Sequence, residues 1–138
     1  MKVVIDTNVF VSSLSSKALF YWLIDAIIDQ KIELCLTNEI ILEYEEVLKR
    51  KYDLFTANNF LASLKQATNV HLIDIYFAFN LIQADPDDDK FVDCATASNA
   101  DWLITNDKHF NVLKTIDFPT VNIIRIEEFE EKFAEFLK

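Results

Sequence analysis

Short apolar runs alternate with longer segments of helical periodicity along the chain. Runs rich in Val, Ile and Leu predict strands at residues 3–5, 32–36, 70–73, 102–105 and 121–125. Apolar residues at helical spacing predict helices at residues 18–30, 40–48, 57–67, 76–82, 87–100 and 127–137, with a short one at Val112. Because strands and helices alternate, the pattern predicts an α/β fold: a three-layer α/β/α sandwich with a central parallel sheet of about five strands.

The organisation of the chain indicates one domain. Its 138 residues are close to the size of a typical domain, and no linker-like stretch divides them. Residues 3–5 and 102–105 are apolar on both faces, which is typical of the central strands of a parallel sheet. We therefore expect a single domain over residues 1–138 in which these two strands lie at the centre.

The absence of glycine from the chain excludes several classes of enzyme. Without glycine there is no G-x-G-x-x-G dinucleotide loop, no G-x-x-x-x-G-K phosphate loop and no G-x-S-x-G nucleophile turn. Rossmann oxidoreductases, P-loop NTPases, kinases with a Gly-rich loop and serine hydrolases of that type are therefore excluded.

The charge balance is acidic, with 23 Asp and Glu against 13 Lys and Arg and a net charge of −10. A broad basic surface for nucleic acid is absent, but acidic side chains can hold metal cations. Cys35 and Cys94 lie in apolar settings, which favours free thiols in a reducing cytoplasm. The apolar stretch 18–24 stops at Asp25 and the first residues do not resemble a signal peptide, so we expect a cytoplasmic protein without a membrane span.

Two strands predicted to be central are each followed by an aspartate. The first strand is followed by Asp6, Thr7 and Asn8, and the fourth by Asn106 and Asp107. Since ligands of open parallel sheets bind beyond the carboxyl ends of the strands, we expect both aspartates at one functional edge. Capping of the following helix or turn is the alternative for either residue alone.

A run of acids follows Asp85-Pro86. Asp89 and Asp93 are four residues apart and share a helix face, where like charges cost about 0.2–0.5 kcal/mol. A cation beside them would remove this repulsion. Asp87 and Asp88 fit the ordinary role of capping a solvated helix start.

A further acid is expected on the helix after Thr37-Asn38. Glu43 and Glu45 flank its apolar stripe equally, so periodicity does not choose between them. Clustered carboxylates without a supporting Cys or His set favour Mg²⁺ or Mn²⁺ over zinc or copper. Such sites polarise phosphates and activate water.

Four segments, taken in order, resemble the motifs of PIN-domain nucleases. They are VVIDTNVF at residues 3–10, EYEEVL at 43–48, DPDDDKFVDCA at 85–95 and ADWLITND at 100–107. Their order and spacing extend over most of the chain, which is most similar to the toxin components of bacterial toxin–antitoxin operons (VapC-like). The resemblance implies a PIN-like fold and a Mg²⁺- or Mn²⁺-dependent ribonuclease that hydrolyses phosphodiester bonds of RNA.

The resemblance also implies roles for individual residues. Asp6, Glu43, Asp89 and Asp107 match the catalytic and metal-binding acids, with Asp93 as a neighbouring ligand and Asp88 as another candidate for the third acid. The supporting polar residues are Thr7, Asn8, Thr105 and Asn106. Asn106 stands where the family often has glycine, and asparagine tolerates positive φ better than most residues.

The resemblance to toxins implies a cognate antitoxin as partner, and the apolar helix at residues 19–24 indicates a homodimer face or a groove for an antitoxin helix. We expect Lys49, Arg50 and Lys51 to contact RNA phosphates. The alternatives are a housekeeping RNA-processing nuclease and a PIN-fold binding module without catalysis. A haloacid-dehalogenase-type phosphatase is disfavoured, because its D-x-D motif would place an aspartate where Asn8 stands.

Overall fold

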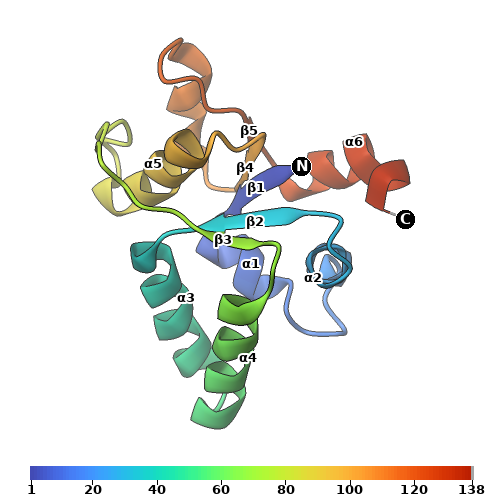
Figure 1. Cartoon of the computed structure of the whole chain (residues 1–138). Coiled ribbons are helices and arrows are strands. Elements are labelled where there is room, and N and C mark those ends of the chain that lie inside the picture. The colour runs from blue at the N-terminus through green and yellow to red at the C-terminus, as the bar shows by residue number, and fades with distance from the viewer. Residues whose placement is uncertain (138) are drawn as a thin grey trace.

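Five parallel strands form the centre of the computed structural model, which describes residues 1–137 (Figure 1). Their order across the sheet is β3-β2-β1-β4-β5, and every neighbouring pair is parallel. The strands are β1 (Lys2–Ile5), β2 (Glu33–Leu36), β3 (Val70–Leu72), β4 (Trp102–Ile104) and β5 (Ile123–Ile124). The sheet confirms the predicted arrangement, with β1 and β4 as neighbours near its centre.

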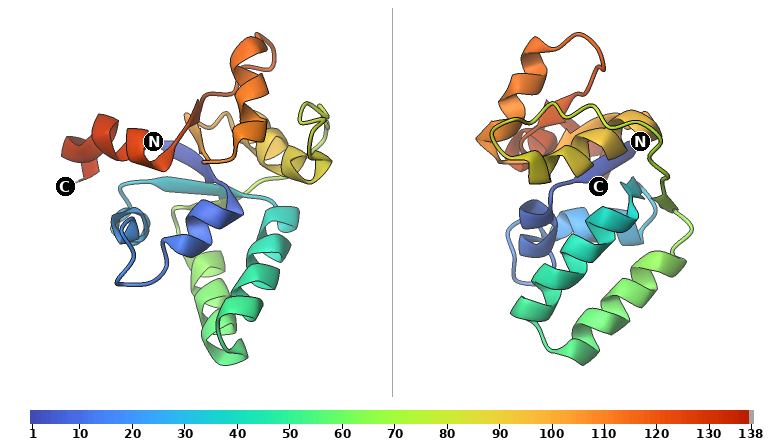
Figure 2. Two further views of the ribbon diagram at one scale, coloured as in Figure 1. Left: turned by 180° about the vertical axis from the view of Figure 1, so that it is seen from behind. Right: turned by 90° about the vertical axis from the view of Figure 1, so that its left-hand side faces the viewer.

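The helices cover both faces of this sheet. They are α1 (Thr7–Ser12), α2 (Tyr21–Ile28), α3 (Asn38–Lys51), α4 (Leu54–Gln66), α5 (Asp89–Ser98) and α6 (Ile126–Leu137), with 3₁₀ helices η1 (Pro86–Asp88) and η2 (Lys108–Thr115). Figures 1 and 2 show α1 to α4 on one side of the sheet and α5 with η2 on the other. The protein therefore has the predicted α/β/α sandwich.

The core explains why β1 is central. Val3, Val4 and Ile5 are fully buried, as expected for a strand covered on both faces. On the side of α1 and α3, the rings of Phe10 and Tyr44 stack with their centroids 4.3 Å apart. This contact fixes α3 against the helix that follows β1, and so helps to position the residues at the end of that strand.

Two parts of the chain differ from the predicted elements. The predicted helix at residues 76–82 is absent, and this segment runs without regular structure between β3 and η1. Its backbone N–H groups at Phe79 and Ile82 donate to the carboxylates of Asp93 and Asp89. These contacts replace the hydrogen bonds of a helix, which apolar periodicity alone cannot reveal. Helix α1 was not predicted, and α2 begins at Tyr21, later than expected.

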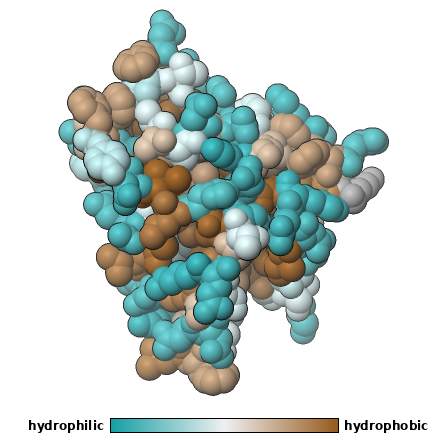
Figure 3. All heavy atoms as spheres, in the orientation of Figure 1, coloured by the Kyte–Doolittle hydropathy of each residue, from teal (hydrophilic) through white to brown (hydrophobic). Residues whose placement is uncertain are grey.

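The apolar segment at residues 19–24 is largely covered within the fold. Leu23 and Ile24 are buried, and Trp22 stacks on Phe129 of α6 at 6.2 Å between ring centroids. Leu19 and Ile28 nevertheless remain exposed. Further exposed apolar side chains lie at the α3–α4 turn, along β3 and in the following segment; they include Leu54, Phe55, Leu72, Tyr76 and Phe77. Figure 3 shows apolar side chains around the space between α3 and β3 and at the far end of the α3–α4 hairpin. Over residues 1–137, no helix is both long and apolar enough to cross a membrane.

Candidate active site

Asp6 lies at the carboxyl end of β1, where the chain turns into α1. Its backbone N–H donates to the carbonyl of Ile104 at 3.0 Å, which ties the ends of β1 and β4 together. Its side chain is buried, and the hydroxyl of Thr105 donates to Oδ2 at 2.8 Å. Burial raises the pKa of Asp6; the Thr105 hydrogen bond lowers it, and the charges of Asp107 and Glu43 raise it again, with a net rise.

Thr105 also positions Asp107 at the end of β4. Its Oγ1 accepts the backbone N–H of Asp107 at 3.1 Å while its hydroxyl donates to Asp6, so one buried threonine orients both segments. Asp107 Oδ1 accepts the backbone N–H of His109 at 2.9 Å, which starts η2. Both acids line a cavity of about 360 Å³, together with Asn8. The predicted meeting of two strand-end aspartates is therefore present in the fold.

Glu43 approaches this edge of the sheet from α3. The hydroxyl of Tyr44 donates to the carbonyl of Ile5, which holds α3 against the end of β1. The hydroxyl of Thr7 donates to Glu43 Oε2, and the ammonium of Lys90 lies 3.0 Å from Glu43 Oε1. Both carboxylate oxygens of Glu43 thus have partners from other elements.

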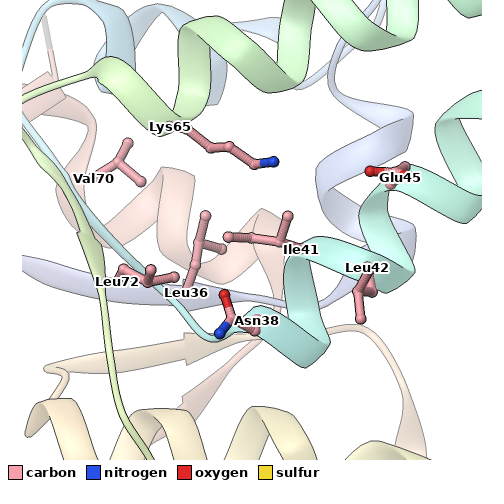
Figure 4. Close-up of a pocket in the computed structure, with 8 residues that line it drawn as sticks. All are labelled: Leu36, Asn38, Ile41, Leu42, Glu45, Lys65, Val70 and Leu72. Carbon is pink, nitrogen blue, oxygen red and sulfur yellow. The ribbon is translucent and has the colours of Figure 1, made fainter.

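Glu45 faces a different part of the molecule. It pairs with Lys49 at 2.9 Å and lines an apolar cavity of about 480 Å³ between α3, α4 and β3. Figure 4 shows Glu45 and Lys65 at this cavity, whose walls include Leu36 and Ile41. Of the two glutamates that periodicity left equivalent, Glu43 is the one beside Asp6.

Asp88, at the end of η1, is the third acid that the structure brings to this edge. Burial raises its pKa to about 7, helped by the charges of Asp85, Asp6 and Asp107 and opposed by His109. Carboxylate oxygens of Asp85 and Asp88 and a ring nitrogen of His109 lie within 4.8 Å of one another. Oδ2 of Asp88 is buried, and no hydrogen-bond donor among the described residues reaches it.

Asp89 and Asp93, which the sequence favoured at this position, have structural contacts. Asp89 Oδ1 accepts the backbone N–H of Ile82 at 2.8 Å, and Asp93 Oδ1 accepts that of Phe79 at 3.1 Å. Both side chains are buried and hold the segment between β3 and η1 against α5. The geometry therefore favours Asp88 over Asp89 and Asp93 as the acid facing Asp6 and Asp107.

The donor set fits a divalent cation. Buried carboxylates that repel one another, among them one with an unpartnered oxygen, carry a cost that a bound cation would remove. Their oxygens are the hard ligands that Mg²⁺ and Mn²⁺ prefer. Asp88 has Asp85 and His109 at ligand spacing and the charges of Asp6 and Asp107 nearby, so it lies among the residues that would hold such an ion.

Lys90 links Glu43 to the start of α5. Its side chain is only 9% exposed, and its ammonium lies 3.0 Å from both Glu43 Oε1 and Asp87 Oδ1. Burial lowers the pKa of Lys90, but the hydrogen bonds to Asp87 and Glu43 outweigh this effect and raise it above its usual value. Lys90 is thus the internal counter-charge of an otherwise acidic site.

We expect Lys90→Met to lower the free energy of unfolding in metal-free buffer by about 2 kcal/mol, less than the 3–5 kcal/mol of a fully buried pair because Glu43 remains partly solvated. The more negative site should then gain more stability from Mg²⁺ than the wild type does. Thermal unfolding of both proteins, with chelator and with Mg²⁺, measures the two effects. An unchanged unfolding temperature would show that the bridge is dispensable.

Other predicted residues lie further from this cluster or act differently. Lys49 and Arg50 are in the last turn of α3, where they pair with Glu45 and Glu46, and Lys51 ends the helix. The structure does not bring these three cations to the acids.

Asn106 does not adopt the positive φ that glycine would favour at this position of the family motif. Among the described residues positive φ occurs elsewhere, at Gln30, Asn80 and Asn99. The side chain of Asn106 instead accepts the backbone N–H of Ile126 at 3.2 Å, linking the end of β4 to the start of α6.

Sequence reasoning gave Asp88 only as an alternative third acid and did not assign Lys90 to the site. His109 Nδ1 lies 3.5 Å from Asp107 Oδ1 and 3.8 Å from Asp88 Oδ2, although the imidazole is half exposed. The placement of His109 two residues after Asp107 was the one available signal. A lysine that follows acids in the sequence is ordinarily exposed to solvent. Nothing in the pattern therefore predicted that Lys90 would be buried.

Comparison with known proteins identifies the family. The sequence profile of the PIN domain matches residues 2–109, so the chain belongs to the PIN-domain family. Among solved structures it is similar to a chain of VapBC2 from Rickettsia felis bound to a DNA fragment from their promoter. The TM-score is 0.62 at 14% sequence identity, over 91% of this chain and 98% of that chain. No curated protein matches the sequence. The family predicted from the four motifs is thus confirmed, and the structural likeness confirms the fold.

Proposed function

We propose that the protein is a Mg²⁺- or Mn²⁺-dependent ribonuclease that hydrolyses phosphodiester bonds. The observation that carries this proposal is the convergence of buried, mutually repelling acids at the carboxyl edge of β1 and β4. Membership of the PIN-domain family supports a nuclease. The catalytic acids in this proposal are Asp6, Glu43, Asp88 and Asp107.

In this proposal some residues bind the cation and others position the carboxylates. Asp6, Asp88 and Asp107 hold the cation, which when bound polarises a phosphate and favours ionisation of an attacking water. Thr105 fixes the orientation of Asp6, while Thr7 and Lys90 fix Glu43. His109, beside Asp107 and Asp88, is placed to contact substrate at the open side of the site.

We further propose that this nuclease is the toxin of a toxin–antitoxin pair. The similarity in fold to a chain of VapBC2 supports this assignment. An antitoxin would cover exposed apolar side chains such as Tyr76 and Phe77, and self-association through the same surfaces would give a homodimer. Co-purification of a small protein encoded beside this gene, together with loss of cleavage in the complex, tests the toxin assignment. A free, constitutively active nuclease would favour the housekeeping alternative.

Cleavage of labelled single-stranded RNA tests the ribonuclease proposal directly. We expect cleavage with Mg²⁺ or Mn²⁺ and none with excess chelator, with activity restored when metal is added back. Equal cleavage in chelator would contradict the proposed role of the acids. An inactive protein that also binds no metal would favour a PIN-fold binding module.

Metal binding should also stabilise the fold, since a ligand that binds only the native state shifts unfolding in its favour. At a hundredfold excess over Kd we expect about 2.7 kcal/mol of stabilisation, or several degrees in Tm. Asp6→Asn should lose most of this shift, whereas Asp25→Asn, at an exposed position on α2, should keep it. Differential scanning calorimetry at millimolar Mg²⁺ or Mn²⁺ measures the shift. Its absence in the wild type would contradict a cation site.

A further inference from the structure

A nuclease with a net charge of −10 needs local cations to hold a polyanionic substrate. Several cations of this chain already have acceptors within the fold. Lys49 and Arg50 pair with glutamates of their own helix, and Lys90 is occupied by Glu43 and Asp87. Arg50 also lies seven residues after Glu43, about 10 Å further along the helix axis. Cations that line a cavity at the acid edge are therefore better placed for phosphate contacts than those of α3.

A second polar cavity, of about 140 Å³, adjoins the acid site between η2 and the end of β5. Its lining contains three cations, Lys108 and Lys114 from η2 and Arg125 from the segment after β5. Neither lysine forms an ion pair within the described part of the chain. Arg125 lies 3.7 Å from Glu127, on the exposed surface, and Glu128 is the further acid of the lining besides Asp107. Cations therefore outnumber acids in this cavity.

The two cavities are neighbours that share two lining residues. Asn106 and Asp107 line both the cavity of Asp6 and the cavity of the three cations. Arg125 follows β5 directly, so it lies at the same carboxyl edge of the sheet as Asp6 and Asp107. Its Nη1 donates to the carbonyl of Asn106 at 3.4 Å, which holds the guanidinium beside a residue that lines both cavities.

We propose that Lys108, Lys114 and Arg125 form a phosphate-binding subsite that holds the RNA backbone next to the bond being cut. This inference rests on the proposed nuclease function and adds the residues that position its substrate. Lysine and arginine at a strand edge bind phosphate oxygens through charge-assisted hydrogen bonds, independently of base identity. The subsite thus determines where the backbone enters the acid site and leaves sequence preference to other contacts.

The experiment compares two sets of three cations. The first variant is Lys108→Gln/Lys114→Gln/Arg125→Gln, and the charge-matched comparison is Lys49→Gln/Arg50→Gln/Lys51→Gln. Both are made in an Asp6→Asn background, so that bound RNA is not cleaved. Fluorescence anisotropy with a labelled single-stranded RNA, over a series of salt concentrations in Mg²⁺, gives the Kd and its salt dependence. All six residues are exposed, so both variants should fold and melt like their parent.

We expect the first variant to bind RNA at least about tenfold more weakly at low salt, because three phosphate contacts are lost. Each phosphate contact with a single strand contributes about 0.7 to the slope of log K against log salt. Losing three contacts should therefore reduce the magnitude of this slope by about 2. The comparison variant should change Kd less than twofold. If the first variant binds like its parent, or the comparison variant loses as much affinity, the subsite assignment is overturned.

Failure of this inference is distinguishable from failure of the nuclease proposal. RNA cleavage and metal-induced stabilisation are measured with Asp6 intact, in proteins that carry all of these cations. If cleavage requires metal but the three substitutions leave RNA affinity unchanged, the nuclease proposal stands and the subsite is wrong. If the wild type neither cleaves RNA nor binds metal, the nuclease proposal fails, and the subsite fails with it.

Discussion

Asp107→Asn and Asp6→Asn are each expected to lower the rate of metal-dependent RNA cleavage by about 10²–10³-fold or more, the range seen when one preorganised electrostatic group is removed. Each substitution keeps the size of the side chain and removes one negative charge from the proposed cation site. Single-turnover cleavage at saturating protein measures the effect. Asp25→Asn is the matched control, because it removes an exposed carboxylate on α2 and should leave the rate unchanged.

The stability of Asp6→Asn should not fall with its cleavage rate. The pKa of Asp6 is raised in the folded protein, chiefly by burial, so its ionised form lowers the free energy of unfolding at neutral pH. Without metal, Asp6→Asn should therefore unfold at the same temperature as the wild type or a higher one. A rate equal to that of the wild type, or a marked loss of stability in chelator, would contradict this account of the acid cluster.

The positions of Asp6 and Asp107 were predictable because they depend on rules that act along the backbone. Both follow apolar strands, and parallel strands present their carboxyl ends at one edge. The buried residues Val3, Val4 and Ile5 supplied the signal for the central strand. Motif order then gave the family, which the sequence profile confirms.

The third acid was harder to predict because the helix changes its geometry within the acidic run. Residues 86–88 form a 3₁₀ helix and α5 begins at Asp89, so a single α-helical wheel over this run misplaces the faces. A 3₁₀ helix has about 3.0 residues per turn and an α-helix about 3.6. The match to the family motif favoured Asp89, whereas in the fold Asp88 lies near Asp6 and Asp107, and Asp89 accepts the backbone N–H of Ile82.

The same tertiary contacts account for the helix that was predicted and is absent. Residues 76–82 have an apolar pattern compatible with a helix, but their N–H groups at Phe79 and Ile82 bond to carboxylates of α5. Local propensity is a weak signal compared with buried hydrogen bonds of this kind. Lys90 was missed for a related reason, since its burial depends on Glu43, which is distant in the sequence.

The adjacent acids Asp88 and Asp89 offer a direct test of this difference, because Asp→Asn at each position changes one atom. We expect Asp88→Asn to abolish metal-dependent cleavage and most of the metal-induced rise in Tm. We expect Asp89→Asn to retain both while lowering the free energy of unfolding by about 1 kcal/mol, because a charge-assisted hydrogen bond to Ile82 is weakened. Equal loss of cleavage in the two variants would contradict the assignment of Asp88.

The pH dependence of stability gives a second test of Asp88. The pKa of Asp88 is about 7 in the folded protein and close to its ordinary 3.8 when unfolded, so the folded state binds the proton more tightly. Without metal, its contribution to stability is lost as pH rises from about 4 to about 7 and is constant above that range. Asp88→Asn should remove this loss, so the variant should become progressively more stable than the wild type over that range. Urea unfolding of both proteins in chelator at several pH values measures this difference. A parallel pH dependence in the wild type and Asp88→Asn would show that Asp88 is not the buried, raised-pKa acid of this site.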